Sequence, residues 1–199
     1  MAAKRATAVK VESQPQVSAP VAAFEEAARA AASEPANEAP WERLEDTVAA
    51  DEGQARALLQ LYRAHLATDL SKALRETVAH RAARFAADCF GENAPESIDV
   101  LRAVLAGAPD ADWAFRPLVV ALTMAERWGE VLDAYDARLA AGRGVERRAE
   151  LLEEAARIAK DFSHDLARAI GYLDRLLRLR PTDAATSASV GRRRSSRSR

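Results

Sequence analysis

The sequence predicts an all-α protein built from stacked helical hairpins, and three observations support this prediction. The 199 residues are 49% hydrophobic and 30% charged, with only 8 Gly and 8 Pro, which is typical of helical proteins. The residues that favour strands never alternate with polar residues over the length of a strand. One stretch of the chain also occurs twice, which indicates a repeated supersecondary unit.

The long repeat has a spacing of 73 residues. The stretch over 58–88 recurs without a gap at 131–161, so that Tyr62 aligns with Tyr135. A shorter period lies inside it, because four segments share an apolar pattern that ends in leucine. They are Leu58/Leu59/Tyr62/Leu66, Ser97/Ile98/Leu101/Leu105, Val131/Leu132/Tyr135/Leu139 and Ala169/Ile170/Leu173/Leu177. A period of this size is typical of helix pairs, since one pair cannot bury its apolar face alone.

Apolar residues at helical spacing, bounded by Ser, Asp, Gly and Pro, predict the individual helices. Residues 1–39 are expected to be mostly disordered, with a short Ala-rich helix at 20–33. Residues 40–181 are expected to form the repeat domain. Its predicted helices run from 40 to about 51 and over 54–68, 71–90, 96–106, 111–127, 130–140, 145–162 and 166–180. The helix over 111–127 is apolar on nearly every side and is expected to be the most buried.

The charge of the chain is distributed unevenly. The formal net charge is -1, but residues 192–199 hold five of the 29 basic residues and no acid, so residues 1–191 carry 24 basic and 30 acidic side chains. The tail over 182–199 is Arg/Ser-rich and is expected to be disordered. The single cysteine, Cys89, excludes an internal disulfide. No apolar run approaches the length of a membrane span, and we predict a cytoplasmic protein.

No pattern of residues predicts catalysis. The sequence contains no Gly-rich phosphate loop and no nucleophile elbow. Its three histidines, His65, His80 and His164, lie at no metal-ligand spacing. We therefore predict no catalytic residue, no cofactor site and no metal site. An enzyme would need a catalytic domain that these residues do not contain.

The repeats resemble those of the tetratricopeptide-repeat superfamily, in which a small residue and, in general, an aromatic residue four positions later precede a closing proline. Ala169, Leu173 and Pro181 follow this pattern. The resemblance covers residues 54–181, although two of the repeat steps, 39 and 38 residues, exceed the usual length of about 34. It implies a right-handed superhelical array of antiparallel helix pairs. It also implies a scaffold or adaptor that binds protein segments in a concave groove lined mainly by the first helices.

The groove candidates are polar side chains on the first helices that face away from the packing seam. They are Thr77, Arg81, Arg84, Arg116, Thr123, Glu150, Glu154 and Arg157. An arginine on an apolar helix either pairs with a carboxylate or binds one from a ligand. The alternative interpretation is a solvated helix face with charge pairs four residues apart.

The last predicted helix, over 166–180, has an apolar arc of about 180°, which is wider than the ~100° stripe that one neighbour covers. The candidate contacts at this open end are Tyr172, Leu176 and Leu179. A terminal repeat normally carries a polar outer face. We therefore predict that this end stacks on a partner, on a second copy of the chain or on further repeats.

The most consistent function is a non-enzymatic scaffold for an unidentified protein or peptide. The alternative is binding of nucleic acid or of an acidic partner through the basic tail over 182–199. No aromatic residue is interleaved with the tail arginines, and the remainder of the chain is acidic, both of which argue against nucleic acid. The tail can also be a disordered end without a selected function.

Overall fold

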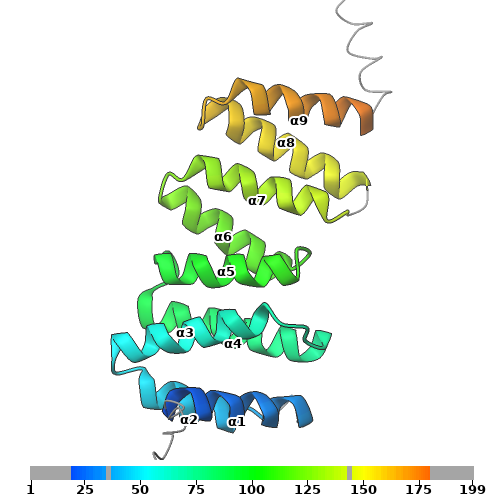
Figure 1. Ribbon diagram of the computed structural model, residues 1–199. Helices are drawn as coiled ribbons and strands as arrows, with labels where there is room; N and C mark the ends of the chain where they lie inside the picture. The colour runs from blue at the N-terminus through cyan, green and yellow to red at the C-terminus, as the bar shows by residue number, and fades with distance from the viewer. Residues whose placement is uncertain (1–18, 35–36, 143–144, 180–199) are drawn as a thin grey trace, which may run out of the picture. The chain divides into compact units, whose positions relative to one another are not determined.

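The computed structural model describes residues 19–34, 37–142 and 145–179, and every regular element within these ranges is an α-helix. This confirms the all-α prediction for the described residues (Figure 1). The helices are α1 (Ala19–Ser33), α2 (Ala39–Val48), α3 (Glu52–Leu66), α4 (Lys72–Phe90), α5 (Pro95–Gly107), α6 (Asp112–Met124), α7 (Trp128–Ala140), α8 (Val145–Asp161) and α9 (Leu166–Leu179).

The chain divides into two compact units between Leu61 and Tyr62, within α3. In the first unit, α1 packs against α2. The Phe24 ring meets the Trp41 ring edge-on, with centroids 5.3 Å apart, and both side chains are buried. The helix expected over 20–33 therefore packs against a second helix. A proline at the start of α2 favours the helical backbone that positions Trp41.

In the second unit, helices α4 to α9 pack in chain order, each against the next (Figure 1). Local turn chemistry separates them. The Ser71 hydroxyl oxygen accepts a hydrogen bond from the Leu74 amide at 3.3 Å at the start of α4, which is a typical N-cap. Gly91, with a φ of 97°, ends this helix, and Pro95 occupies the first turn of α5.

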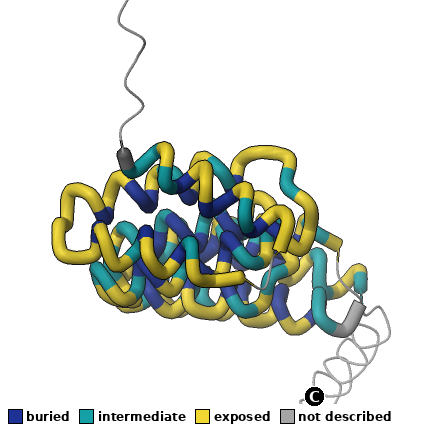
Figure 2. The backbone as a smooth tube through the Cα atoms, turned by 90° about the horizontal axis from the view of Figure 1, so that it is seen from below, coloured by how far each residue is buried: buried dark blue, intermediate teal, exposed yellow. Residues whose placement is uncertain are grey.

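Burial follows the 73-residue repeat. Tyr62 and Tyr135 are both buried, and the small residues Ala82 and Ala155 are buried at matching places in α4 and α8. Along the helices, buried stretches alternate with exposed ones (Figure 2). The repeat in the sequence is therefore also a repeat of buried positions.

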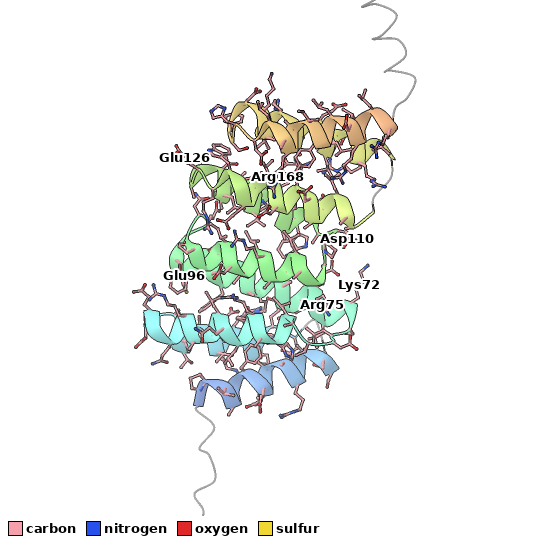
Figure 3. All side chains as sticks on the ribbon, turned by 45° about the horizontal axis from the view of Figure 1, so that its top comes forward. Lys72, Arg75, Glu96, Asp110, Glu126 and Arg168 are labelled. Carbon is pink, nitrogen blue, oxygen red and sulfur yellow. The ribbon has the colours of Figure 1, made fainter. Side chains whose placement is uncertain are left out.

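Helix α6 is not the most buried element, and this part of the sequence analysis was wrong. Val120 is 57% exposed and Met124 is 70% exposed. The helix packs against α5 and α7, and the side that carries Val120 and Met124 is left exposed. The following turn also differs from the expectation, because Trp128 already belongs to α7. Glu126, with a φ of 54° (Figure 3), lies in the turn instead.

Candidate functional site

A cleft between α4 and α6 consists of two cavities that share Trp113 in their walls. The larger has a volume of about 420 Å³ and lies beside Lys72, Glu76 and Asp110. The smaller has a volume of about 240 Å³ and is lined by Ala83 and Ala87 of α4, Ser97 and Leu101 of α5, and Trp113, Pro117 and Val120 of α6. The cleft therefore has a charged end and an apolar end.

Helix α6 carries a row of four apolar side chains at spacings of four, three and four residues, which places them on one side of the helix, and the first three line the smaller cavity. We call Trp113, Pro117, Val120 and Met124 the α6 row. The indole of Trp113 stacks on the imidazole of His80 from α4, with centroids 3.8 Å apart and planes 21° apart. This stacking fixes the wall between the two cavities.

Pro117 lies inside α6 and changes the hydrogen bonding of the helix at the cleft. Proline has no amide hydrogen, so the Trp113 carbonyl lacks the donor that a residue four positions later normally supplies. A carbonyl without this donor is a strong acceptor. Pro117 therefore removes one intrahelical hydrogen bond from α6 beside the apolar end of the cleft.

Charged residues lie at the other end of the cleft. Figure 3 shows Lys72, Arg75 and Asp110 at this end and Glu96 at the opposite end of α5. Arg75 has a structural role, because it donates to the Leu66 carbonyl at 2.8 Å and to the Thr68 carbonyl at 3.2 Å. The ammonium of Lys72, by contrast, makes no ion pair with the described part of the chain, so it is available to a carboxylate.

The residues of α6 that precede the α6 row, Asp112, Arg116 and Thr123, form a neighbouring strip. Asp112 accepts from Arg147 of α8 at 3.5 Å, and Arg147 donates to Glu150 at 3.0 Å. The hydrogen bond to Glu150 contributes most to a raised pKa of Arg147. Arg116 is exposed. Asp112 therefore contacts α8 and also lines the larger cavity of the cleft.

Asp112 also binds a buried arginine on α7. Arg138 is 2% exposed and pairs with the Asp112 carboxylate. It also donates to the Pro109 carbonyl at 2.6 Å and lies over the Phe115 ring at 5.3 Å. These contacts link α6, α7 and α8 at one point.

One predicted groove residue does not face solvent. Arg81 is 4% exposed and belongs to the buried residues of α4, together with Val78 and Ala82. The expectation that Arg81 faces away from the packing seam was therefore wrong. The long side chain of arginine can follow apolar surface while its charged group makes contacts elsewhere.

The other groove candidates occupy different environments. The Thr77 hydroxyl donates to the Ala73 carbonyl at 3.1 Å, so it serves its own helix. Glu154 accepts from the Tyr135 hydroxyl at 2.9 Å. Burial, and then this hydrogen bond, raise the pKa of Tyr135 above its ordinary value. Arg84 and Arg157 are exposed, and none of these residues lines either cavity of the cleft.

The sequence analysis missed the α6 row because it assigned these residues to the core. Two signals pointed to a surface position: the four-three-four spacing on a single strip, and a proline in the interior of the helix. A proline is best tolerated where the freed carbonyl can reach water or a ligand.

At the C-terminal end, the exposed side chains differ from those expected. Tyr172 is buried, and its hydroxyl donates to Asp136 at 3.0 Å. Burial and this hydrogen bond raise the pKa of Tyr172 above its ordinary value. Leu176 and Leu179 are only half-exposed. The exposed apolar residues of α9 are Leu166, Ile170, Leu173 and Leu177.

A further cavity of about 410 Å³ lies between α5 and α7. Its charged groups already have partners, because Glu130 pairs with both Arg102 and Arg127. Asp133, also in its wall, pairs with Arg168 of α9 at 2.6 Å. This cavity offers fewer available polar groups than the α4–α6 cleft.

Two expectations from the sequence are that the chain has no metal site and no membrane span. Within residues 19–34, 37–142 and 145–179 no group of three or more His, Cys, Asp or Glu is placed to hold a metal ion. None of the described helices is long and apolar enough to cross a bilayer. The tail over 182–199, with its predicted binding of acidic partners, lies outside the described residues.

The chain matches no protein-family model. No curated protein and no solved structure matches it either. The function proposed below therefore depends on the geometry of the cleft.

Proposed function

We propose that the protein is a non-enzymatic interaction module that binds a segment of another polypeptide in the α4–α6 cleft. In this proposal, the helix pairs form a right-handed superhelical array of the tetratricopeptide-repeat type. The observation that carries it is the exposed α6 row beside a preformed cleft. Exposed apolar side chains next to a concave surface are typical of interaction sites.

The lining of the cleft indicates the chemistry of the bound segment. The cavity of about 240 Å³ accepts one apolar side chain against Pro117 and Val120. The other end presents charged groups of both signs, among them Lys72 and Glu76. We therefore infer a segment with an apolar anchor and a charged residue.

A peptide-display selection tests this proposal directly. A library of random linear peptides is selected against the immobilised full chain, and the affinities of the enriched peptides are measured by fluorescence anisotropy. Val120→Glu places a charge in the apolar end of the cleft and is expected to weaken binding by at least about tenfold, equivalent to about 1.4 kcal/mol. Peptides that bind through the cleft are expected to contain an apolar residue and a charged residue.

Ile170→Glu on α9 is the matched control. It introduces the same charge at a position with a similar exposed fraction, 60% against 57% for Val120, on another helix. The selected peptides are expected to bind this variant as tightly as the unmodified chain. Equal affinity for Val120→Glu, or an equal loss for both variants, would show that the cleft is not the binding site.

A further inference from the structure

Four apolar side chains line the outer side of α9. Leu166 is 63% exposed, Ile170 60%, Leu173 46% and Leu177 49%. We call these residues the α9 stripe. They make up four of the seven large hydrophobic residues that are exposed in the described ranges. A contiguous row of this kind on a surface marks an interaction site.

The same repeat positions are covered in the preceding helices. Ile170 corresponds to Leu132 and Leu173 to Tyr135 in the repeat alignment, and both of these α7 residues are buried. Helix α9 itself supplies part of the cover, because the Tyr172 hydroxyl lies 3.5 Å from the Leu132 carbonyl of α7. A helix is therefore the kind of element that covers this face.

We propose that the α9 stripe is covered by the α9 stripe of a second copy of the chain, with the two helices antiparallel about a two-fold axis. The spacings along the stripe are four, three and four residues, which read the same in both directions. Leu166 of one copy then lies level with Leu177 of the other, and Ile170 lies level with Leu173. A two-fold contact requires this self-complementarity.

The residues beside the stripe allow the helices to approach. Asp174 and Arg178, four residues apart on the same flank, balance each other in charge. The formal net charge of -1 adds little repulsion between copies.

Other segments of the chain fit this face less well. Residues 180–199 contain a single large apolar residue, Val190, which cannot cover a stripe of four. Helix α1 exposes no large hydrophobic residue. The α6 row is the remaining exposed apolar row in the described ranges, but α9 on α6 is a head-to-tail contact that leads to rings or open chains.

The area of the contact sets its strength. Two stripes with half-exposed side chains offer on the order of 400 Å² of apolar surface, compared with roughly 1,200 Å² or more in a stable interface. The dimer is therefore weak and forms in a concentration-dependent way. It is independent of the polypeptide binding proposed for the α4–α6 cleft.

Sedimentation equilibrium of the full chain, from about 10 μM to about 1 mM to span a weak association, tests the dimer. The unmodified chain is expected to pass from monomer to dimer over this range. Leu173→Glu is expected to raise the dissociation constant at least tenfold. Met124→Glu places the same charge on the α6 row and is expected to leave the dissociation constant unchanged.

The double variant Ile170→Lys/Leu173→Glu tests the antiparallel arrangement. Each lysine then lies level with a glutamate of the other copy, so the double variant is expected to dimerise more strongly than either single variant. Circular dichroism checks that every variant remains helical. The proposal is overturned if the unmodified chain stays monomeric, if it forms open-ended oligomers, if Met124→Glu is as damaging as Leu173→Glu, or if the double variant shows no recovery.

Discussion

The contact between Asp112 and Arg138 gives a quantitative prediction. Asp112→Ala removes the carboxylate that pairs with the guanidinium of Arg138, which is buried, whereas the Asp112 side chain is 59% exposed. The Pro109 carbonyl and the Phe115 ring still contact Arg138 after the change. The substitution therefore leaves a buried cation with fewer compensating contacts, which is the costly way to break such a pair.

The magnitude follows from three contributions. A hydrogen bond to a charged group contributes about 1.5–3 kcal/mol, and the exposure of Asp112 places this pair at the low end, since water replaces part of the interaction. The loss of an acid in the first turn of α6 adds about 0.5 kcal/mol. The exposed pair with Arg147 adds little. We expect Asp112→Ala to lower the free energy of unfolding by about 2 kcal/mol.

Urea and thermal unfolding, followed by circular dichroism at 222 nm, measure this change. A loss of about 2 kcal/mol corresponds to a melting temperature lower by roughly 4–8 °C in a chain of this size. Arg138→Met is the comparison, because it removes the buried charge together with its need for a partner. It is expected to be less damaging than Asp112→Ala, and the double variant less damaging than the two effects added. Additive effects, or a larger loss for Arg138→Met, would refute the reasoning.

Two further predictions concern the buried residues of the second unit. The raised pKa values of Tyr135 and Tyr172 mean that the folded state favours the neutral phenols, so their stabilising effect is complete below the unfolded pKa of about 10 and is lost as the pH rises above it. Replacing both tyrosines with phenylalanine is expected to reduce the fall of the urea midpoint between about pH 10 and pH 11.5, and an unchanged fall would contradict this prediction. Leu139→Ala is expected to lower the free energy of unfolding by about 3 kcal/mol because Leu139 is buried, whereas Leu177→Ala, at the same repeat position but exposed, is expected to change it by about 0.5 kcal/mol. Equal losses of unfolding free energy for the two variants, measured by urea unfolding, would contradict the difference in burial between Leu139 and Leu177.

The helices could be predicted from the sequence because their ends depend on local chemistry. A serine before α4, a glycine after it and a proline at the start of α5 act through the backbone of neighbouring residues. The apolar positions of the repeat also repeat every 73 residues, so their shared burial followed from the pattern. These features do not depend on where distant helices lie.

The candidate site could not be predicted in the same way. Helix α6 is apolar on most sides, and periodicity alone does not indicate which side α5 and α7 leave open, so Val120 and Met124 were assigned to the core. The apolar arc of α9 posed the same difficulty. Tyr172 turned inward because Asp136 accepts its hydroxyl hydrogen, a contact between residues that are 36 positions apart.

The order of packing in the second unit has a mechanical consequence. Because each helix from α4 to α9 packs mainly on its neighbours in the chain, a pulling force applied at α9 would peel helices away one after another rather than break the unit at once. Peeling under such a force begins at α9, the helix to which the force is applied. A second copy bound to the α9 stripe would raise the force needed to detach the hairpin of α8 and α9.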